Sequence, residues 1–160
     1  MLIRRQTIFL SILLLSVYYP QTLYATTSIY DIQYNTNKGN NCYDSNFTDQ
    51  IVTTTGIITA IKPGTSPTFY IQDFNYDSYA GIFIYDDDQN PVIGDKVIIT
   101  AEVAEFYGLT ELINVTAFNV TSNENSFTPK DISTGDLANG CTETGESLEG
   151  MLVRVNNVIV

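Results

Sequence analysis

Short runs of β-type residues, separated by turn residues, recur over residues 51–120 and constrain the fold more than any other feature. The first run, IVTTTGIITAI over residues 51–61, is rich in β-branched residues, and its alternation disfavours a helix. Gly56 in the middle of this run predicts a bend, where one strand can serve both halves of a barrel. Glycine, proline, asparagine and aspartate separate the four runs that follow, at residues 69–73, 81–85, 96–106 and 109–120.

Five strands with no intervening helical pattern predict an all-β fold. The arrangement expected is a five-stranded OB-like Greek-key barrel over residues 51–122. In the fourth run the residues from Val97 to Val103 alternate between an apolar and a more polar face, whereas the fifth run loses its phase near Asn114, which predicts a β-bulge. An immunoglobulin-like sandwich is the alternative, but it would need about seven strands and a cysteine pair between its sheets.

Three segments flank the predicted barrel. They are residues 26–50, an N-terminal strand or loop; residues 123–148, a linker with a short helical turn; and residues 149–160, the first strand of a second, incomplete β module. Ile29, Ile32 and Tyr34 are expected to pack on the barrel as a short strand or lid. The last run, residues 151–160, echoes residues 51–60, which is why it is interpreted as the start of a truncated second module.

The first 25 residues have the pattern of a signal peptide. Arg4 and Arg5 precede an apolar run at residues 8–19, and Ala25 supplies the small residue of a cleavage site. The run is too short to span a bilayer, which needs about 20 apolar residues. We therefore expect a secreted chain, extracellular or periplasmic, with no stable membrane anchor after cleavage; an uncleaved anchor or an N-terminal core helix is the alternative.

The chain is strongly acidic once the predicted signal peptide is removed. Five lysines and arginines then face 18 aspartates and glutamates, a net charge of −13. Non-specific binding of nucleic acid depends on cations that neutralise phosphates. This composition argues against such binding and favours solubility or cation binding.

Cys42 and Cys141 are the two cysteines of the sequence. An oxidising compartment and an even count predict a disulfide between them. It would tie the segment before the first strand to the segment after the last. Two free thiols, or pairing with other partners, are the alternatives.

No catalytic residue is predicted. The chain has no histidine, which excludes nucleophile systems activated by histidine and zinc sites that use histidine ligands. Phosphate-binding and dinucleotide-binding glycine motifs are missing as well. We therefore expect no cofactor in this chain, apart from Ca²⁺ or Mg²⁺ as a weak candidate.

Acidic residues after the second and third strands make the only candidate metal site. Carboxylate oxygens are the ligands that Ca²⁺ and Mg²⁺ prefer, although the spacing matches no EF-hand loop. A solvated acidic turn is the alternative interpretation. The candidate ligands are Asp73, Asp77, Asp86, Asp87 and Asp88.

Aromatic residues on the second and third strands make a candidate ligand-binding face. OB barrels commonly bind ligands on these strands, where aromatic rings stack on bases, and tyrosines also stack on sugars. The alternative is that the rings only cover the barrel or pack against another domain. The candidate residues are Tyr70, Gln72, Phe83, Tyr85 and Tyr107.

The ordered segments SIYDIQYNT, IVTTTGIITAI, FYIQDFN, GIFIYD, IGDKVIITAEVAEFYGLTEL and TGDLANG, followed by SLEGMLVRVNNV, resemble a known domain. They are similar to the OB-fold-like N-terminal domain of secreted bacterial nucleases related to the endonuclease/exonuclease/phosphatase superfamily. The resemblance covers about residues 28–160 and implies secretion, a nucleic-acid context and a metal-dependent catalytic domain downstream, before which this chain is truncated. A binding or spacer module of another secreted or cell-surface protein, recognising a glycan or a cation, is the alternative.

Overall fold

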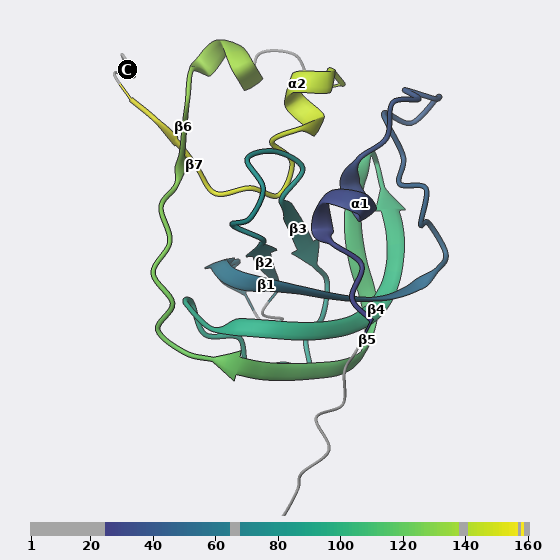
Figure 1. The fold of residues 1–160 in the computed structure, drawn as a ribbon. Helices are drawn as coiled ribbons and strands as arrows, with labels where there is room; N and C mark the ends of the chain where they lie inside the picture. The colour runs from purple at the N-terminus through teal and green to yellow at the C-terminus, as the bar shows by residue number, and fades with distance from the viewer. Residues whose placement is uncertain (1–24, 65–67, 138–140, 157, 159–160) are drawn as a thin grey trace, which may run out of the picture.

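The computed structural model describes residues 25–64, 68–137, 141–156 and 158, in which five strands close into a ring (Figure 1). The strand order is β1-β2-β3-β5-β4, and β4 pairs back with β1. The pairing of β3 with β5 is parallel and the other pairings of the ring are antiparallel. The predicted all-β fold is confirmed, with strands β1 (Ile51–Ile61), β2 (Phe69–Gln72), β3 (Gly81–Ile84), β4 (Lys96–Phe106) and β5 (Leu109–Ser122).

Strand β1 serves two neighbours, as the glycine in its middle predicted. Its first part, Ile51–Ile57, pairs with β4, and its second part, Ile57–Ile61, pairs with β2. The change of partner occurs beside Gly56, where a Cβ would lie 3.1 Å from the carbonyl oxygen of Gln72. A side chain at this position would press on the backbone of β2, because that backbone lies close to Gly56.

The bulge predicted near Asn114 is confirmed. Thr100 pairs with Ala117, but Glu102 pairs with Ile113, so more residues lie on β5 than on β4 between these two pairs. Asn114 itself has a positive φ of 51°. The extra residues bend β5 around the barrel.

The core fills the inside of the ring with the alternating apolar residues that the sequence pattern predicted. The side chains with no exposed surface come from all five strands, for example Ile58, Phe69, Ile82, Val97 and Leu112. Full burial of a side chain of this size contributes about 1.5–3 kcal/mol. Their neighbours along each strand point outward, and these outward residues are available to form a site.

A short helix, α1 (Ile29–Gln33), occupies the segment for which a strand or loop was predicted (Figure 1). The side chain of Ser28 caps it and accepts a hydrogen bond of 3.0 Å from the backbone N–H of Asp31. Ile29 and Ile32 are three residues apart, which places them on one side of a helix, and both are fully buried in the core. No strand forms here because this spacing and this cap fit a helical turn. The predicted packing on the barrel is confirmed for Ile29 and Ile32, whereas Tyr34 is 38% exposed.

The segment after the barrel folds back onto it. It comprises β6 (Lys130–Ile132), the 3₁₀ helix η1 (Thr134–Leu137), α2 (Glu143–Glu146) and β7 (Val153–Val155). The helical turn predicted within residues 123–148 is η1. Strand β7 pairs in parallel with β6, so the predicted linker and the predicted first strand of a further module form one two-stranded sheet.

The predicted disulfide between Cys42 and Cys141 is confirmed, with 5.4 Å between the two Cα atoms. It links the segment before β1 to the segment after β5, across 99 positions of the sequence. The predicted signal peptide falls almost entirely on residues 1–24, which lie outside the described residues. Within the described ranges, no helix is long and apolar enough to cross a membrane.

Residues 147–152 contact the start of β3 at a point where two glycines meet. The backbone N–H of Tyr79 donates to the carbonyl of Ser147 at 2.7 Å, and the N–H of Leu152 donates to Oε1 of Gln72 at 2.8 Å. Between these bonds, a Cβ on Gly81 would lie 2.2 Å from the carbonyl carbon of Gly150. Only glycine therefore allows the two backbones to approach this closely.

We predict that Gly81→Ala displaces residues 147–152 from the barrel and lowers the free energy of unfolding by about 2–3 kcal/mol. Urea unfolding measures the loss, and hydrogen exchange at the Leu152 amide reports the displacement. Gly135→Ala is the matched control, because its Cβ would meet nothing closer than 3.6 Å. Equal stability of the two variants would contradict the close approach.

Candidate functional site

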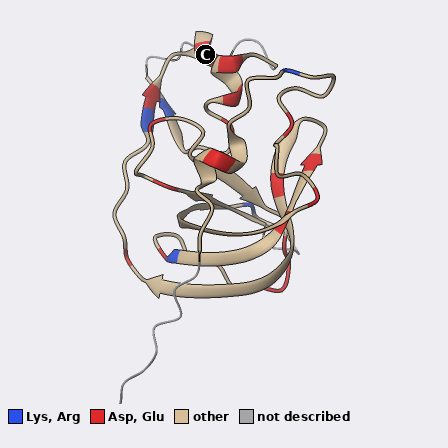
Figure 2. Cartoon of the chain, turned by 45° about the vertical axis from the view of Figure 1, so that its right-hand side comes forward, with Lys and Arg blue, Asp and Glu red and all other residues tan. Residues whose placement is uncertain are grey.

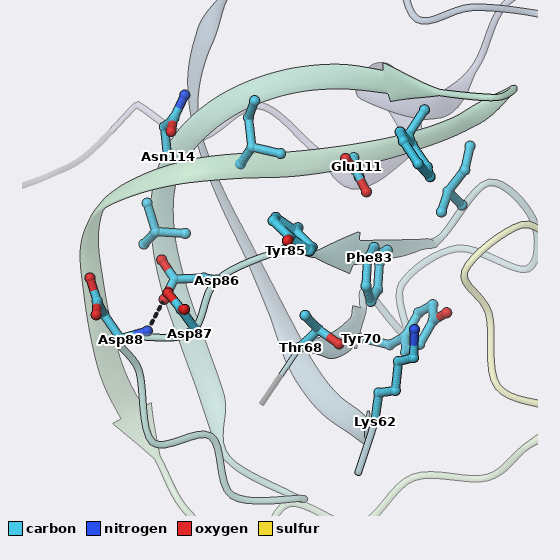
Figure 3. Close-up of a pocket in the computed structure, with 14 residues that line it drawn as sticks. Lys62, Thr68, Tyr70, Phe83, Tyr85, Asp86, Asp87, Asp88, Glu111 and Asn114 are labelled. Atoms are coloured by element: carbon cyan, nitrogen blue, oxygen red, sulfur yellow. Dashed lines mark hydrogen bonds between the residues drawn. The ribbon is translucent and has the colours of Figure 1, made fainter. Parts of the chain in front are cut away.

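A groove lies on the outer surface of the barrel where β2, β3 and β5 are neighbours (Figure 3). Its volume is about 740 Å³, within the range of small-molecule and peptide sites. The apolar part of its surface comes mainly from β3 and from the hairpin of β4 and β5. The residues of this part are Phe83, Phe106, Leu109, Ile113 and Val115.

One row of directly paired residues crosses the groove. Tyr70 on β2 pairs with Phe83 on β3, and Phe83 pairs with Glu111 on β5. The rings of Tyr70 and Phe83 are tilted, with centroids 4.9 Å apart. Phe83 is only 7% exposed and Glu111 only 8% exposed, so the row forms the floor of the groove.

The rim of the groove is acidic. Asp86, Asp87 and Asp88 lie along one side, with Oδ1 of Asp86 accepting a hydrogen bond of 2.8 Å from the N–H of Asp88 (Figure 3). Lys62, on the other side, is the only basic residue among the described residues that line the groove. Figure 2 shows the same imbalance over the molecule, with many red acidic positions and few blue basic ones. The groove therefore carries a negative potential.

Three of the five predicted ligand-binding residues meet in this groove: Tyr70, Phe83 and Tyr85, the last of them 61% exposed. Gln72 does not join them. It points to the outside of the barrel, but Leu152 covers it, and only 3% of it is exposed. Tyr107 lies at the turn between β4 and β5, 97% exposed, beside a different hollow next to the disulfide.

The predicted metal ligands do not come together. Asp86, Asp87 and Asp88 line the groove, whereas Asp73 uses Oδ1 to accept a hydrogen bond of 3.0 Å from the N–H of Asn75 in a local turn. Asp77 lies further along the same loop, where its backbone carbonyl accepts a hydrogen bond from Lys130. Among the described residues, no three acidic side chains form a group that could hold a metal ion.

Strand β5 contributes residues to the groove that the sequence pattern did not predict. Leu109, Glu111 and Ile113 alternate along the strand and point into the groove together. The signal was a single glutamate between two apolar residues on the same face of a predicted strand. Its meaning depends on the parallel pairing of β3 with β5, which no local pattern indicates.

A second group of acidic side chains lies between the barrel and α2. Oε1 of Glu105 accepts hydrogen bonds from the N–H of Ser45 at 2.7 Å and from the hydroxyl of Thr110 at 2.8 Å. Oε1 of Glu149 accepts one of 3.0 Å from the N–H of Thr110. Oε1 of Glu146 lies 2.8 Å from Sγ of Cys42.

Burial changes the protonation of this group. It raises the pKa of Glu149 to about 8 and that of Glu146 to about 7, and the negative charge of Glu105 raises the pKa of Glu146 further. These carboxyls touch the segment that folds back onto the barrel. We therefore expect their protonation to influence how firmly that segment attaches to the barrel.

Comparison with known proteins found no family model that matches the chain and no curated protein that matches its sequence.

We predict that Glu149→Gln makes the fold less sensitive to alkaline pH. The pKa of Glu149 is raised in the folded chain, so its stabilising contribution is complete below about pH 4.5 and is lost as the pH rises through about 8. The neutral variant should gain about 1–2 kcal/mol in the free energy of unfolding at about pH 8.5 and little at about pH 5. Urea unfolding at both pH values measures this.

Glu124→Gln is the control for Glu149→Gln, because Glu124 is exposed and the substitution removes the same charge. If the two variants show the same change of unfolding free energy with pH, the total charge of the chain, and not the burial of Glu149, would cause the pH dependence of stability.

Proposed function

We propose that this chain is an exported, non-catalytic binding module, which serves as an accessory domain of a secreted nuclease or phosphoesterase whose catalysis another domain carries. The observation that carries the binding role is the groove on β2, β3 and β5. It combines exposed aromatic surface with a nearly buried polar group, Glu111, and its volume suits a small ligand or a peptide. The nuclease context rests on the resemblance of the ordered sequence segments.

The available chemistry supports binding more than catalysis. The chain has no histidine, and Cys42 and Cys141 are joined in a disulfide, so neither group supplies a base or a nucleophile. The carboxylates of the groove lie beside aromatic and apolar side chains, and Lys62 is the one basic group among the described lining residues. This arrangement can hold and orient a ligand.

The charge of the groove argues against nucleic acid as its ligand. Asp86, Asp87, Asp88 and Glu111 oppose only Lys62, so a phosphate chain laid along the groove would meet repulsion. The tyrosines could stack on bases, but they would have to do so without neutralising the backbone. In a nuclease, this module would therefore contact a partner other than the substrate strand.

A glycan is the second candidate ligand. Tyr85 exposes its ring to the groove, and the carboxylates on the rim are suitable acceptors for sugar hydroxyls (Figure 3). The same arrangement would serve a module of another secreted or cell-surface protein.

We predict that a short single-stranded DNA causes no binding signal with the disulfide-intact chain at about 0.15 M salt, because the groove is acidic. Fluorescence anisotropy of a labelled oligonucleotide measures this. A tight complex that weakens as salt rises would contradict the prediction. Cleavage of the oligonucleotide in the presence of Mg²⁺ or Ca²⁺ would contradict the non-catalytic assignment.

A positive test is a survey by NMR of neutral oligosaccharides and short peptides on the isotope-labelled chain. The proposal expects a neutral or cationic ligand to shift the signals of Tyr70, Phe83 and Tyr85. Tyr85→Ala should weaken that binding, whereas Tyr107→Ala, at an exposed site outside the groove, should not. The binding role fails if no ligand of either class shifts the groove signals.

A further inference from the structure

Glu111 is a buried acid without a partner. The residue is only 8% exposed, and no described residue donates a hydrogen bond to its carboxylate, whose oxygens keep some contact with the solvent of the groove. Buried carboxylates are normally paired, because leaving one unpaired costs free energy. Burial and the nearby charge of Glu105 accordingly raise the pKa of Glu111. The carboxylate of Glu111 could therefore form an ion pair with a cation brought by a ligand.

The residues around Glu111 indicate which kind of cation would bind there. Phe83 lies directly across the parallel strand pair, and Tyr85 follows it at the edge of the groove (Figure 3). Aromatic faces attract organic cations, and this attraction strengthens where water is excluded. A cation that reaches Glu111 would therefore meet both a carboxylate and aromatic rings.

A planar organic cation fits this setting better than a metal ion. Ca²⁺ takes six to eight oxygen ligands, whereas only one carboxylate lies at the floor of the groove and the others are at its rim. A guanidinium group is weakly hydrated, stacks on aromatic rings and binds a carboxylate through two parallel hydrogen bonds. An arginine side chain also has an apolar stem, which could lie along Ile113 or Leu109.

We propose that the groove binds an arginine side chain of a partner peptide, with the guanidinium on Glu111 and the flanking peptide on the exposed apolar rim. This inference rests on the binding role proposed above and names its ligand class. Phe106, 58% exposed, and Tyr85, 61% exposed, provide surface for an apolar residue next to the arginine. Asp86, Asp87 and Asp88 draw the positive charge toward the groove.

The test uses acetyl-phenylalanyl-arginine amide as the probe and the same peptide with citrulline as its neutral, nearly isosteric match. NMR titration of the disulfide-intact, isotope-labelled chain gives the affinities and the location of binding. The arginine peptide should shift the signals of Phe83, Tyr85 and Glu111. It should bind about tenfold or more tightly than the citrulline peptide, because a hydrogen bond to a buried charge is lost in the latter.

Glu111→Gln should abolish the preference for arginine, so that both peptides bind with similar affinity. Glu124→Gln, the same change at an exposed position outside the groove, should alter the affinity by less than about twofold. Retained signal dispersion of Glu111→Gln shows that the variant is folded. If Glu111→Gln does not fold, the comparison of the two peptides on the unmodified chain still tests whether the groove prefers arginine.

Equal binding of the two peptides would overturn the arginine inference, and so would an undiminished preference in folded Glu111→Gln. In either case, binding of a peptide or an oligosaccharide to the groove would leave the broader binding role intact. Failure of every ligand to shift the groove signals would overturn both.

Discussion

The parallel pairing of β3 with β5 closes the barrel. Only two residue pairs form it, Phe83 with Glu111 and Ile84 with Leu112, and the N–H of Tyr85 extends it with a bond of 2.9 Å to the carbonyl of Leu112. Without this pairing the sheet would be an open strip whose ends could not enclose a core. Ile84 and Leu112 point inward and are fully buried, whereas Phe83 and Glu111 point outward into the groove. Closure of the barrel and construction of the candidate site therefore use the same pair of strands.

Two acids with little exposed surface lie where parts of the chain distant in sequence meet. Glu111 lies at the closing strand pair, and Glu149 lies where the C-terminal segment meets the barrel. Each loses hydration on folding, and neither has a basic partner among the described residues. The two differ in their partners: Glu149 accepts a hydrogen bond from the N–H of Thr110, whereas no described residue donates one to Glu111, which lines the groove. This difference makes the first a determinant of stability and the second a candidate for recognition.

The sequence predicted those parts of the fold that depend on local patterns. Alternation along residues 51–61 and 96–106, the bend at Gly56 and the bulge at Asn114 follow from the chemistry of neighbouring residues, and the structure has them all. Helix α1 was missed because five residues give too short a pattern to separate a helical turn from a strand. Gln72 was misplaced because residues 80 positions away cover it. Glu111 was missed for a similar reason. Its neighbours in the groove lie on other strands, and the alternation of residues along one strand does not predict which strands pair.

The protonation of Glu111 is the most direct test, because the site depends on a carboxylate that is largely buried, accepts no hydrogen bond from a described residue and is open to a cation. Carboxyl-carbon NMR, recorded as a function of pH on the free chain and on the chain saturated with the arginine peptide, measures the pKa in both states. The account predicts a pKa above the ordinary 4.5 in the free chain and a clear decrease when the guanidinium binds. A pKa at or below 4.5 in the free chain, or one that the peptide leaves unchanged, would contradict it.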